Sequence, residues 1–99
     1  VTVVLGVDAG GSKTVALVAD AHGRVLGWGR GGGGDIYVSE TGAVAAVAAA
    51  VEGALSAAGL EARDITSACL SLAGADWPED FAFWQREAEA KGYGQAVAV

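Results

Sequence analysis

A short glycine-containing segment lies between two apolar runs near the start of the chain. The runs are residues 3–7 and 15–19, and the segment between them is Asp8-Ala9-Gly10-Gly11-Ser12-Lys13-Thr14. The first run is nearly continuously apolar, as expected of a central strand that is buried on both faces. A connection this short joins neighbouring antiparallel strands. The sequence therefore predicts a hairpin whose strands cover residues 1–7 and 13–19.

The residue types in this turn favour anion binding. Gly10 and Gly11 let the backbone turn with positive φ and let another group approach closely. Exposed N–H groups in such a turn form a concave anion site. The hydroxyls of Ser12 and Thr14 add donors. Because side chains alternate along a strand, both hydroxyls are predicted to face the anion, with Lys13 on the other side.

Asp8 adds a carboxylate at the end of the first predicted strand. A carboxylate in this place can position a divalent cation, directly or through water. The structural alternative is a carboxylate that stabilises the turn. Together with the donors of the turn, Asp8 predicts a site for a metal-bound polyphosphate, such as a nucleotide.

Two other phosphate motifs do not fit the segment. In a P-loop the lysine directly follows a glycine, whereas Ser12 precedes Lys13 here. A P-loop also opens a helix, but residues 15–19 form a β-rich run that ends at the turn signal of residues 20–23. The G-x-G-x-x-G fingerprint is absent as well, which leaves a β-turn-β phosphate hairpin.

The pattern Asp-x-Gly-Gly-Ser-x-Thr resembles the first phosphate motif of the actin, hexokinase and Hsp70 superfamily. Within it, the chain is most similar to the N-acetylglucosamine kinase and BadF/BadG/BcrA/BcrD ATPase family, in the segments VLGVDAGGSKT, GGGGDIY and SLAGAD. The resemblance implies a ribonuclease-H-like (actin-like ATPase) domain that binds ATP and Mg²⁺. It places Mg²⁺ at Asp8 and the phosphates at Gly10, Gly11, Ser12, Lys13 and Thr14.

The resemblance also implies an activity for a longer protein, namely phosphoryl transfer from ATP to a sugar or amino sugar. The family's catalytic base is an aspartate in an Asn-Asp segment, which is expected beyond Val99. Residues 1–99 are therefore predicted to be an N-terminal fragment, inactive alone, whose partner is a C-terminal domain of the same protein. Two alternatives stay open: a BadF-type ATPase that activates a dehydratase, and a sugar-sensing module without turnover.

The rest of the chain alternates strand and helix signals. The order β-β-β-α-β-α-β matches the ribonuclease-H-like half of the superfamily, which implies an α/β fold with a mixed five-stranded sheet of order 3-2-1-4-5 and flanking helices. Ser39 or Thr41 is expected to cap the first helix and Gly59 to end it. An aromatic stripe on the second helix is expected to be core or interdomain surface. The further strands are predicted over residues 24–29, 65–73 and 96–99, and the helices over residues 44–58 and from Trp77 to Gly92.

Three further residues are candidates for contact with the substrate. The second glycine cluster, residues 29–35, ends in Asp35, about where the family places a sugar-contacting asparagine. The alternatives are that the cluster is a flexible linker and that Asp35 caps a turn or helix. Gly74 and Asp76 follow the strand predicted over residues 65–73, and ligands gather beyond the carboxyl ends of strands in α/β sheets. Asp76 could equally cap the next helix.

The net charge, the apolar runs and the single cysteine limit which partners and which location the sequence predicts. The net charge of −6 argues against non-specific nucleic-acid binding and against docking on anionic membranes. No run of about 20 apolar residues is found for a membrane span, and no signal-peptide pattern opens the chain, so the cytoplasm is the expected location. The single cysteine, Cys69, is expected to be a buried, reduced thiol. The sequence leaves open whether the protein forms a homodimer.

Overall fold

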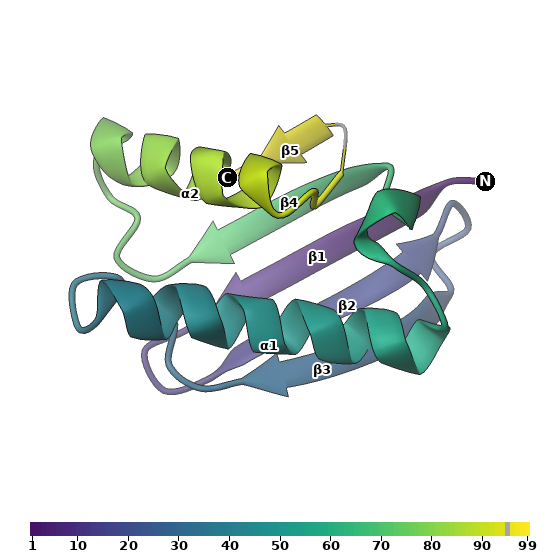
Figure 1. Cartoon of the computed structure of the whole chain (residues 1–99), viewed down its shortest axis with the longest axis horizontal. Helices are drawn as coiled ribbons and strands as arrows, with labels where there is room; N and C mark the ends of the chain where they lie inside the picture. Colours follow the sequence, from purple (N-terminus) through teal and green to yellow (C-terminus); the bar gives the residue numbers. More distant parts are fainter. Residues whose placement is uncertain (95) are drawn as a thin grey trace.

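The computed structural model describes residues 1–94 and 96–99 and contains a five-stranded sheet with two α-helices (Figure 1). The strand order is β3-β2-β1-β4-β5, which confirms the predicted mixed sheet of order 3-2-1-4-5. The elements follow one another as β1 (Val3–Ala9), β2 (Thr14–Asp20), β3 (Val25–Gly31), α1 (Glu40–Ala58), the 3-10 helix η1 (Ala62–Asp64), β4 (Ser67–Leu72), α2 (Pro78–Ala90) and β5 (Ala96–Ala98).

Strand directions bring three loops to one edge of the sheet. β1 is antiparallel to β2, and β2 is antiparallel to β3, so β3 runs in the direction of β1. β4 is parallel to β1, and Asp8 of β1 pairs with Ser71 of β4. Because β1, β3 and β4 share a direction, the loops that follow them leave the same edge, which is at the left of Figure 1.

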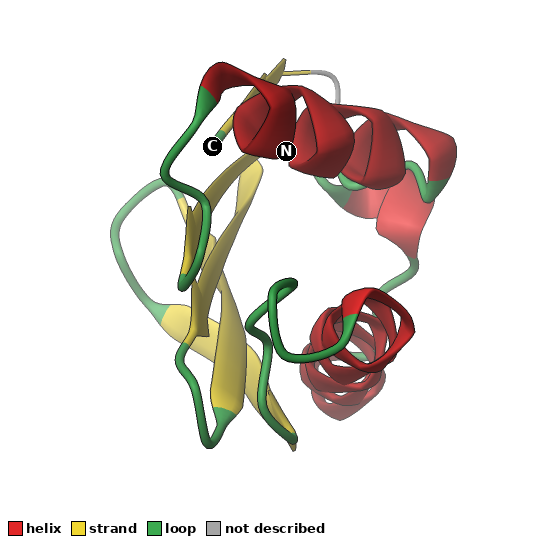
Figure 2. Cartoon of the chain, turned by 90° about the vertical axis from the view of Figure 1, so that its left-hand side faces the viewer, coloured by secondary structure: helices red, strands yellow, loops and turns green. Residues whose placement is uncertain are grey.

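Both α-helices pack on the same face of the sheet (Figure 2). The covered face carries every second residue of β1, and these residues form one hydrophobic cluster with α1 and with Trp84 of α2. The opposite face is left uncovered in the described part of the chain, and Asp8, Leu17 and Trp28 are exposed on it.

Cys69 also lies on the uncovered face and is exposed, so the prediction of a buried thiol is wrong. Its neighbours Ala68 and Leu70 are buried toward the helices. Since side chains alternate along a strand, Cys69 must point the other way. The apolar run of β4 suggested burial on both faces, but only one face is covered among the described residues.

Glycines let α1 lie very close to β3. Gly27, Gly29 and Gly31 occupy alternate positions of β3 and face α1. A Cβ atom at Gly29 would lie 2.5 Å from the backbone nitrogen of Ala54, and one at Gly27 would lie 2.8 Å from that of Ala58. Any larger residue at these positions would therefore push α1 away from the sheet. The helix presents small residues at the same contact, spaced four apart: Ala46, Ala50 and Ala54.

The ends of α1 follow the sequence signals. The Ser39 hydroxyl accepts a hydrogen bond from the Gly42 N–H at 3.0 Å, and Gly59 ends the helix with φ of 69°. By length and composition alone α1 could cross a membrane, which was not expected from the sequence. In the structure it is the core helix of the domain, with a stripe buried against the sheet: Ala43, Ala46, Val47, Ala50, Val51, Ala54 and Leu55.

The aromatic stripe of α2 divides between core and surface. Trp84 is 1% exposed and its ring meets that of Phe83 edge-on, with centroids 5.4 Å apart. Trp77 and Phe81 are 63% and 41% exposed. The core prediction is therefore confirmed for Trp84 and for Ala88, which continues the stripe and is also 1% exposed, and an interdomain role for the other two stays a prediction.

Candidate functional site

Asp8 is the second-last residue of β1, and its side chain lies on the uncovered face of the sheet. Its carboxylate is exposed and receives no hydrogen bond or salt bridge from residues 1–94 and 96–99. Asp8 and Lys13 line a cavity of about 550 Å³ together with Gly6, Val7, Val15, Leu17 and Cys69. The structure thus places a free carboxylate and an ammonium group beside the first turn.

The first glycine loop, residues 10–13, presents backbone N–H groups to open space. The Gly10 N–H donates to the Lys13 carbonyl at 2.8 Å and closes the turn. The N–H groups of Gly11, Ser12 and Lys13 meet no acceptor in the part of the chain that the structure describes. A Cβ atom at Gly11 would have no atom within 4 Å. Free amides around open space are the donors of a concave anion site.

Two expectations about this loop are wrong. Gly10 and Gly11 do not have positive φ, so the turn does not depend on glycine for its backbone conformation. The Thr14 side chain is fully buried, and its hydroxyl donates to the Gly32 carbonyl at 2.9 Å. Ser12 and Thr14 therefore do not face an anion together. Thr14 starts the regular strand and points to the covered face, while Ser12 lies in the exposed bend before it.

The second glycine loop, residues 32–34, is docked against the first. The Gly34 N–H donates to the Gly10 carbonyl at 2.9 Å, and the Thr14 hydroxyl donates to the Gly32 carbonyl. A Cβ atom at Gly34 would lie 2.7 Å from that of Ala9 and 2.8 Å from the Thr14 hydroxyl oxygen. The alternative of a free, flexible linker is therefore wrong. Gly29 and Gly31, which the sequence placed in this cluster, belong to β3.

Asp35 and Gly74 are brought into contact although 39 positions separate them in the sequence. One Asp35 carboxylate oxygen accepts the Tyr37 N–H at 2.9 Å, which confirms the alternative of turn capping, while contact with the substrate stays a prediction. Gly74 has φ of 80°, and a Cβ atom there would collide with the Asp35 carboxylate and lie 3.2 Å from the Tyr37 ring. The loops after β3 and β4 therefore meet at Gly74.

Asp76 does not cap α2, so that structural alternative is wrong. Trp77 occupies the position before the first helical residue, Pro78. The Asp80 carboxylate instead accepts the N–H groups of Asp76 and Trp77, at 3.1 and 3.0 Å. The Asp76 side chain is exposed and makes no hydrogen bond within the described residues. An acid at the third helical position accepts N–H groups that precede the helix, whereas a residue before the helix would accept those of its first turn.

The hydroxyl of Tyr37 completes this group by donating to both carboxylate oxygens of Asp80, at 2.9 and 3.0 Å. Burial acts to raise the pKa of Asp80, but the hydrogen bonds from Trp77, Tyr37 and Asp76 outweigh it and hold that pKa below its ordinary value. The hydrogen bond to Asp80 raises the pKa of Tyr37. Sequence reasoning missed this pair, because nothing local links residues 43 positions apart.

The residues beside the first glycine loop fit a bound magnesium ion. No group of three or more His, Cys, Asp or Glu in the described residues could hold a metal alone. In nucleotide sites, however, Mg²⁺ is usually held by one or two carboxylates with phosphate oxygens and water. The free Asp8 carboxylate provides the protein ligand of such a set, and the free amides provide donors for the phosphate whose oxygens complete it.

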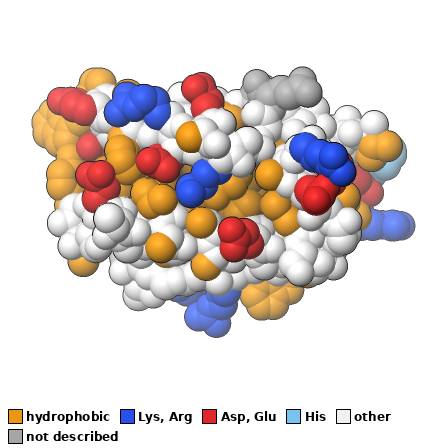
Figure 3. All heavy atoms as spheres, viewed as in Figure 1, with side chains coloured by type: hydrophobic (Ala, Val, Ile, Leu, Met, Phe, Trp, Pro, Cys, Tyr) orange, Lys and Arg blue, Asp and Glu red, His pale blue; other side chains and the backbone are white. Residues whose placement is uncertain are grey.

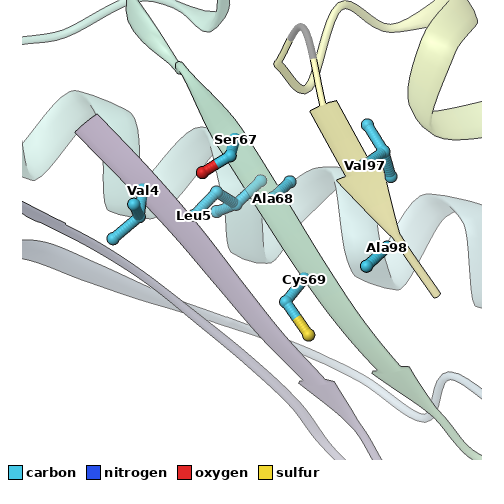
Figure 4. A pocket seen from close by; sticks show the side chains of 7 residues that line it. All are labelled: Val4, Leu5, Ser67, Ala68, Cys69, Val97 and Ala98. Carbon is cyan, nitrogen blue, oxygen red and sulfur yellow. The ribbon is translucent and has the colours of Figure 1, made fainter. Parts of the chain in front are cut away.

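Two other hollows in the surface lie outside the candidate site. One of about 430 Å³ is lined from β1, β4 and β5 by apolar side chains with Ser67 and Cys69 (Figure 4). Another of about 400 Å³ lies between the helices, where Figure 3 shows hydrophobic side chains among acidic and basic ones. Neither is lined by a residue of the loops that follow β1 and β3. The groove between the helices is lined by Glu40, Thr41, Val44, Ala45, Ala48, Phe83, Glu87 and Lys91.

The sheet order and the first hairpin define the class of the molecule, an actin-like ATPase domain. The chain belongs to the BadF/BadG/BcrA/BcrD ATPase family, whose family model matches residues 5–90. No curated protein matches the chain.

Solved structures show the same fold. A protein proposed to be an N-acetylglucosamine kinase, from Chromobacterium violaceum, aligns with 99% of this chain at 22% identity and a TM-score of 0.71. YeaZ from Pseudomonas aeruginosa aligns with 100% of it at 15% identity and a TM-score of 0.58. The chain spans only 34% and 43% of the lengths of these two proteins.

Proposed function

We propose that this chain is the phosphate-binding domain of an ATP-dependent kinase that acts on a sugar or amino sugar. The observation that supports the proposal most directly is the free carboxylate of Asp8 beside the free N–H groups of residues 11–13. The kinase proposed for the similar protein from Chromobacterium violaceum supports the sugar as acceptor.

In this proposal the first glycine loop binds the β- and γ-phosphates. The N–H groups of Gly11, Ser12 and Lys13 donate to phosphate oxygens, and each such bond to a charged group is worth about 1.5–3 kcal/mol. The Ser12 hydroxyl and the Lys13 ammonium group add donors from exposed positions. Gly10 and Thr14 act indirectly, because their hydrogen bonds fix the shape of the loop.

Asp8 would hold Mg²⁺ beside the phosphates. A bound Mg²⁺ supplies positive charge to the phosphate oxygens as phosphoryl transfer proceeds. The chain's own part is to keep the Asp8 carboxylate on the rigid end of β1, between its pairing partners Val15 and Ser71. This rigidity would fix the position of the Asp8 carboxylate relative to the amides of the loop when the metal is bound.

The acceptor is proposed to bind beside the loops after β3 and β4, which leave the same edge of the sheet. Asp35, Gly74 and Asp76 lie there, and carboxylates accept hydrogen bonds from sugar hydroxyls. The acidic surroundings disfavour an anionic acceptor. No residue of the chain is proposed as the catalytic base, which we assign to another part of the protein, together with the domain that closes over the nucleotide.

Replacing Asp8 tests the metal site. In the whole protein, Asp8→Asn should weaken binding of a nonhydrolysable ATP analogue in the presence of Mg²⁺ by about tenfold, or about 1.4 kcal/mol. Binding without Mg²⁺ should not weaken, since the variant loses the metal contact and also the repulsion between the carboxylate and the phosphates. Titration calorimetry with and without Mg²⁺ measures both.

Asp20→Asn is the matched control for this test. Asp20 ends β2 at the opposite edge of the sheet, where its carboxylate accepts the N–H groups of His22 and Arg24. The same charge is removed far from the first glycine loop, so Mg²⁺-dependent affinity should stay as in the wild type. Equal losses in the two variants, or no loss in Asp8→Asn, would refute the metal site.

A pair of glycine variants tests the phosphate contact separately. Gly11→Ala and Gly32→Ala each add a methyl group where no atom lies within 4 Å and φ is not positive, so both should fold. Only Gly11→Ala adds it beside the free amides, so only this variant should lose affinity for the ATP analogue. Similar affinities in the two variants would contradict phosphate binding at this loop.

The alternatives within the family give different results in the whole protein. A dehydratase activator needs cysteine ligands for an iron–sulfur cluster, and this chain supplies one cysteine. Bound iron in the purified protein would favour the activator. ATP binding without turnover on any sugar would favour a sensor.

A further inference from the structure

One side-chain contact joins the loops that follow β3 and β4. The Tyr37 hydroxyl, at the end of the turn after the second glycine loop, reaches both carboxylate oxygens of Asp80 in the first turn of α2. Both segments lie at the left of Figure 1. We refer to this contact as the Tyr37–Asp80 link.

The exposure of the two partners shows that the link is not core packing. Asp80 is only 8% exposed, whereas Tyr37 is 64% exposed. A tyrosine that stabilises a core buries its ring and brings its hydroxyl to a partner at the edge. Here the ring stays largely in solvent and the hydroxyl reaches a buried carboxylate. The contact therefore fixes one loop relative to the other while burying little apolar surface.

The link acts on the residues proposed to hold the acceptor. On one side, Tyr37 follows Asp35 and donates its own N–H to that carboxylate. On the other side, the same Asp80 oxygen that accepts the Tyr37 hydroxyl accepts the Asp76 N–H. Gly74 lies between, with room for the Asp35 carboxylate and the Tyr37 ring only because it lacks a side chain.

From this arrangement we infer that Tyr37 and Asp80 are positioning residues, which set the placement of Asp35 relative to Asp76 and thereby the affinity for the acceptor sugar. The inference rests on the proposed kinase function. Neither residue is needed to touch the sugar. The first glycine loop is fastened separately, through Gly34 and Thr14, so nucleotide affinity does not depend on the link.

Kinetics of the whole protein test this separation. With ATP and N-acetylglucosamine as the probe, Tyr37→Phe should raise the KM for the sugar about tenfold, the expected size for loss of a hydrogen bond to a charged acceptor. The KM for ATP should change less than about twofold, because the first loop keeps its own bonds. Equal increases in both KM values, or an unchanged sugar KM, would overturn the inference.

Tyr93→Phe is the matched control. Tyr93 is the other tyrosine of the chain and is 5% exposed, and its N–H donates to the Ala88 carbonyl at the end of α2. Removing its hydroxyl makes the same chemical change away from the link. Both KM values should remain those of the wild type, and a raised sugar KM in this variant would count against a specific role for Tyr37.

Amide hydrogen exchange tests the link without catalysis. Tyr37→Phe should speed exchange at residues 35–38 and at Asp76 and Trp77, and leave Gly10 and Gly34 unchanged. If the protein does not phosphorylate N-acetylglucosamine but shows this pattern, the link stands and the choice of acceptor fails. If exchange is unchanged at both segments, the link does not position them and the inference fails.

Discussion

The two glycine loops at the same edge of the sheet use glycine for opposite purposes. In the first loop, a side chain at Gly11 would meet nothing, and neighbouring N–H groups stay free. In the second loop, a side chain at Gly33 would collide with the Gly11 carbonyl, and the Gly34 N–H is already bonded to Gly10. One loop keeps space open, and the other uses the missing side chain to pack closely.

This difference assigns separate tasks to the two loops. The second loop forms a support against which the first is held, and the first can therefore present its amides without folding over them. Preorganised donors bind charge better than donors that must first be ordered. Substitutions at Gly33 and Gly34 should consequently affect stability, and a substitution at Gly11 should affect ligand affinity.

Among substitutions in the two glycine loops, the largest effect on stability is expected from Gly33→Ala. The added methyl group has no room beside the backbone of Gly11, so the two loops must separate, and overpacking of this kind costs about 1–3 kcal/mol. Gly11→Ala should change stability by less than about 1 kcal/mol, with a gain expected from the stiffer unfolded chain. Urea unfolding of both variants measures the difference. Similar losses in the two would show that the loops do not differ as described.

A smaller effect is expected from Thr14→Val. The variant keeps the shape of the buried side chain but removes the bond to the Gly32 carbonyl, which should cost about 0.5–1.5 kcal/mol. Thr14→Ser retains the hydroxyl and serves as the control for that bond, although it loses a buried methyl group. If Thr14→Val matches the wild type in chemical unfolding, the hydroxyl does not fasten the loops.

The fold was largely predictable, because its signals are local or follow from strand order. Ser39 and Gly59 mark the ends of α1 by capping chemistry, and the resemblance of the run of elements to the actin-like superfamily implied the sheet order. Which face of the sheet the helices cover was not predictable in the same way. Cys69 was expected to be buried because β4 is apolar, yet both helices lie on the other face. The face that a helix covers depends on the path of the segments that connect it to the strands. The apolar sequence of one strand carries no information about that path.

The candidate site was predicted in its composition but not in its internal bonding. The motif gave Asp8 and residues 10–14 as neighbours, and strand direction brings Asp35, Gly74 and Asp76 to the same edge. The inward direction of Thr14 and the capping of α2 by Asp80 depend on where a strand or helix begins, to within one residue. Boundaries of this kind are weakly encoded. The Tyr37–Asp80 link spans 43 positions and has no local signal.

The smallest expected effect concerns acid, and it again separates the loops. The pKa of Asp80 is lower in the folded protein than its ordinary value of 3.8, so its contribution to stability is complete above that value and is lost as the pH falls through the lowered pKa. Protonation weakens the hydrogen bonds that Asp80 accepts from Tyr37, Asp76 and Trp77. As the pH falls below about 4, amide exchange should therefore quicken at Asp76 and Trp77 at a higher pH than at Gly34, whose bond to Gly10 involves no titrating group.

Asp80→Asn is the control, because it should remove this difference in pH dependence. If Asp76, Trp77 and Gly34 all lose protection at the same pH, in the wild type and in the variant, then acid opens the whole domain at once and the prediction is wrong.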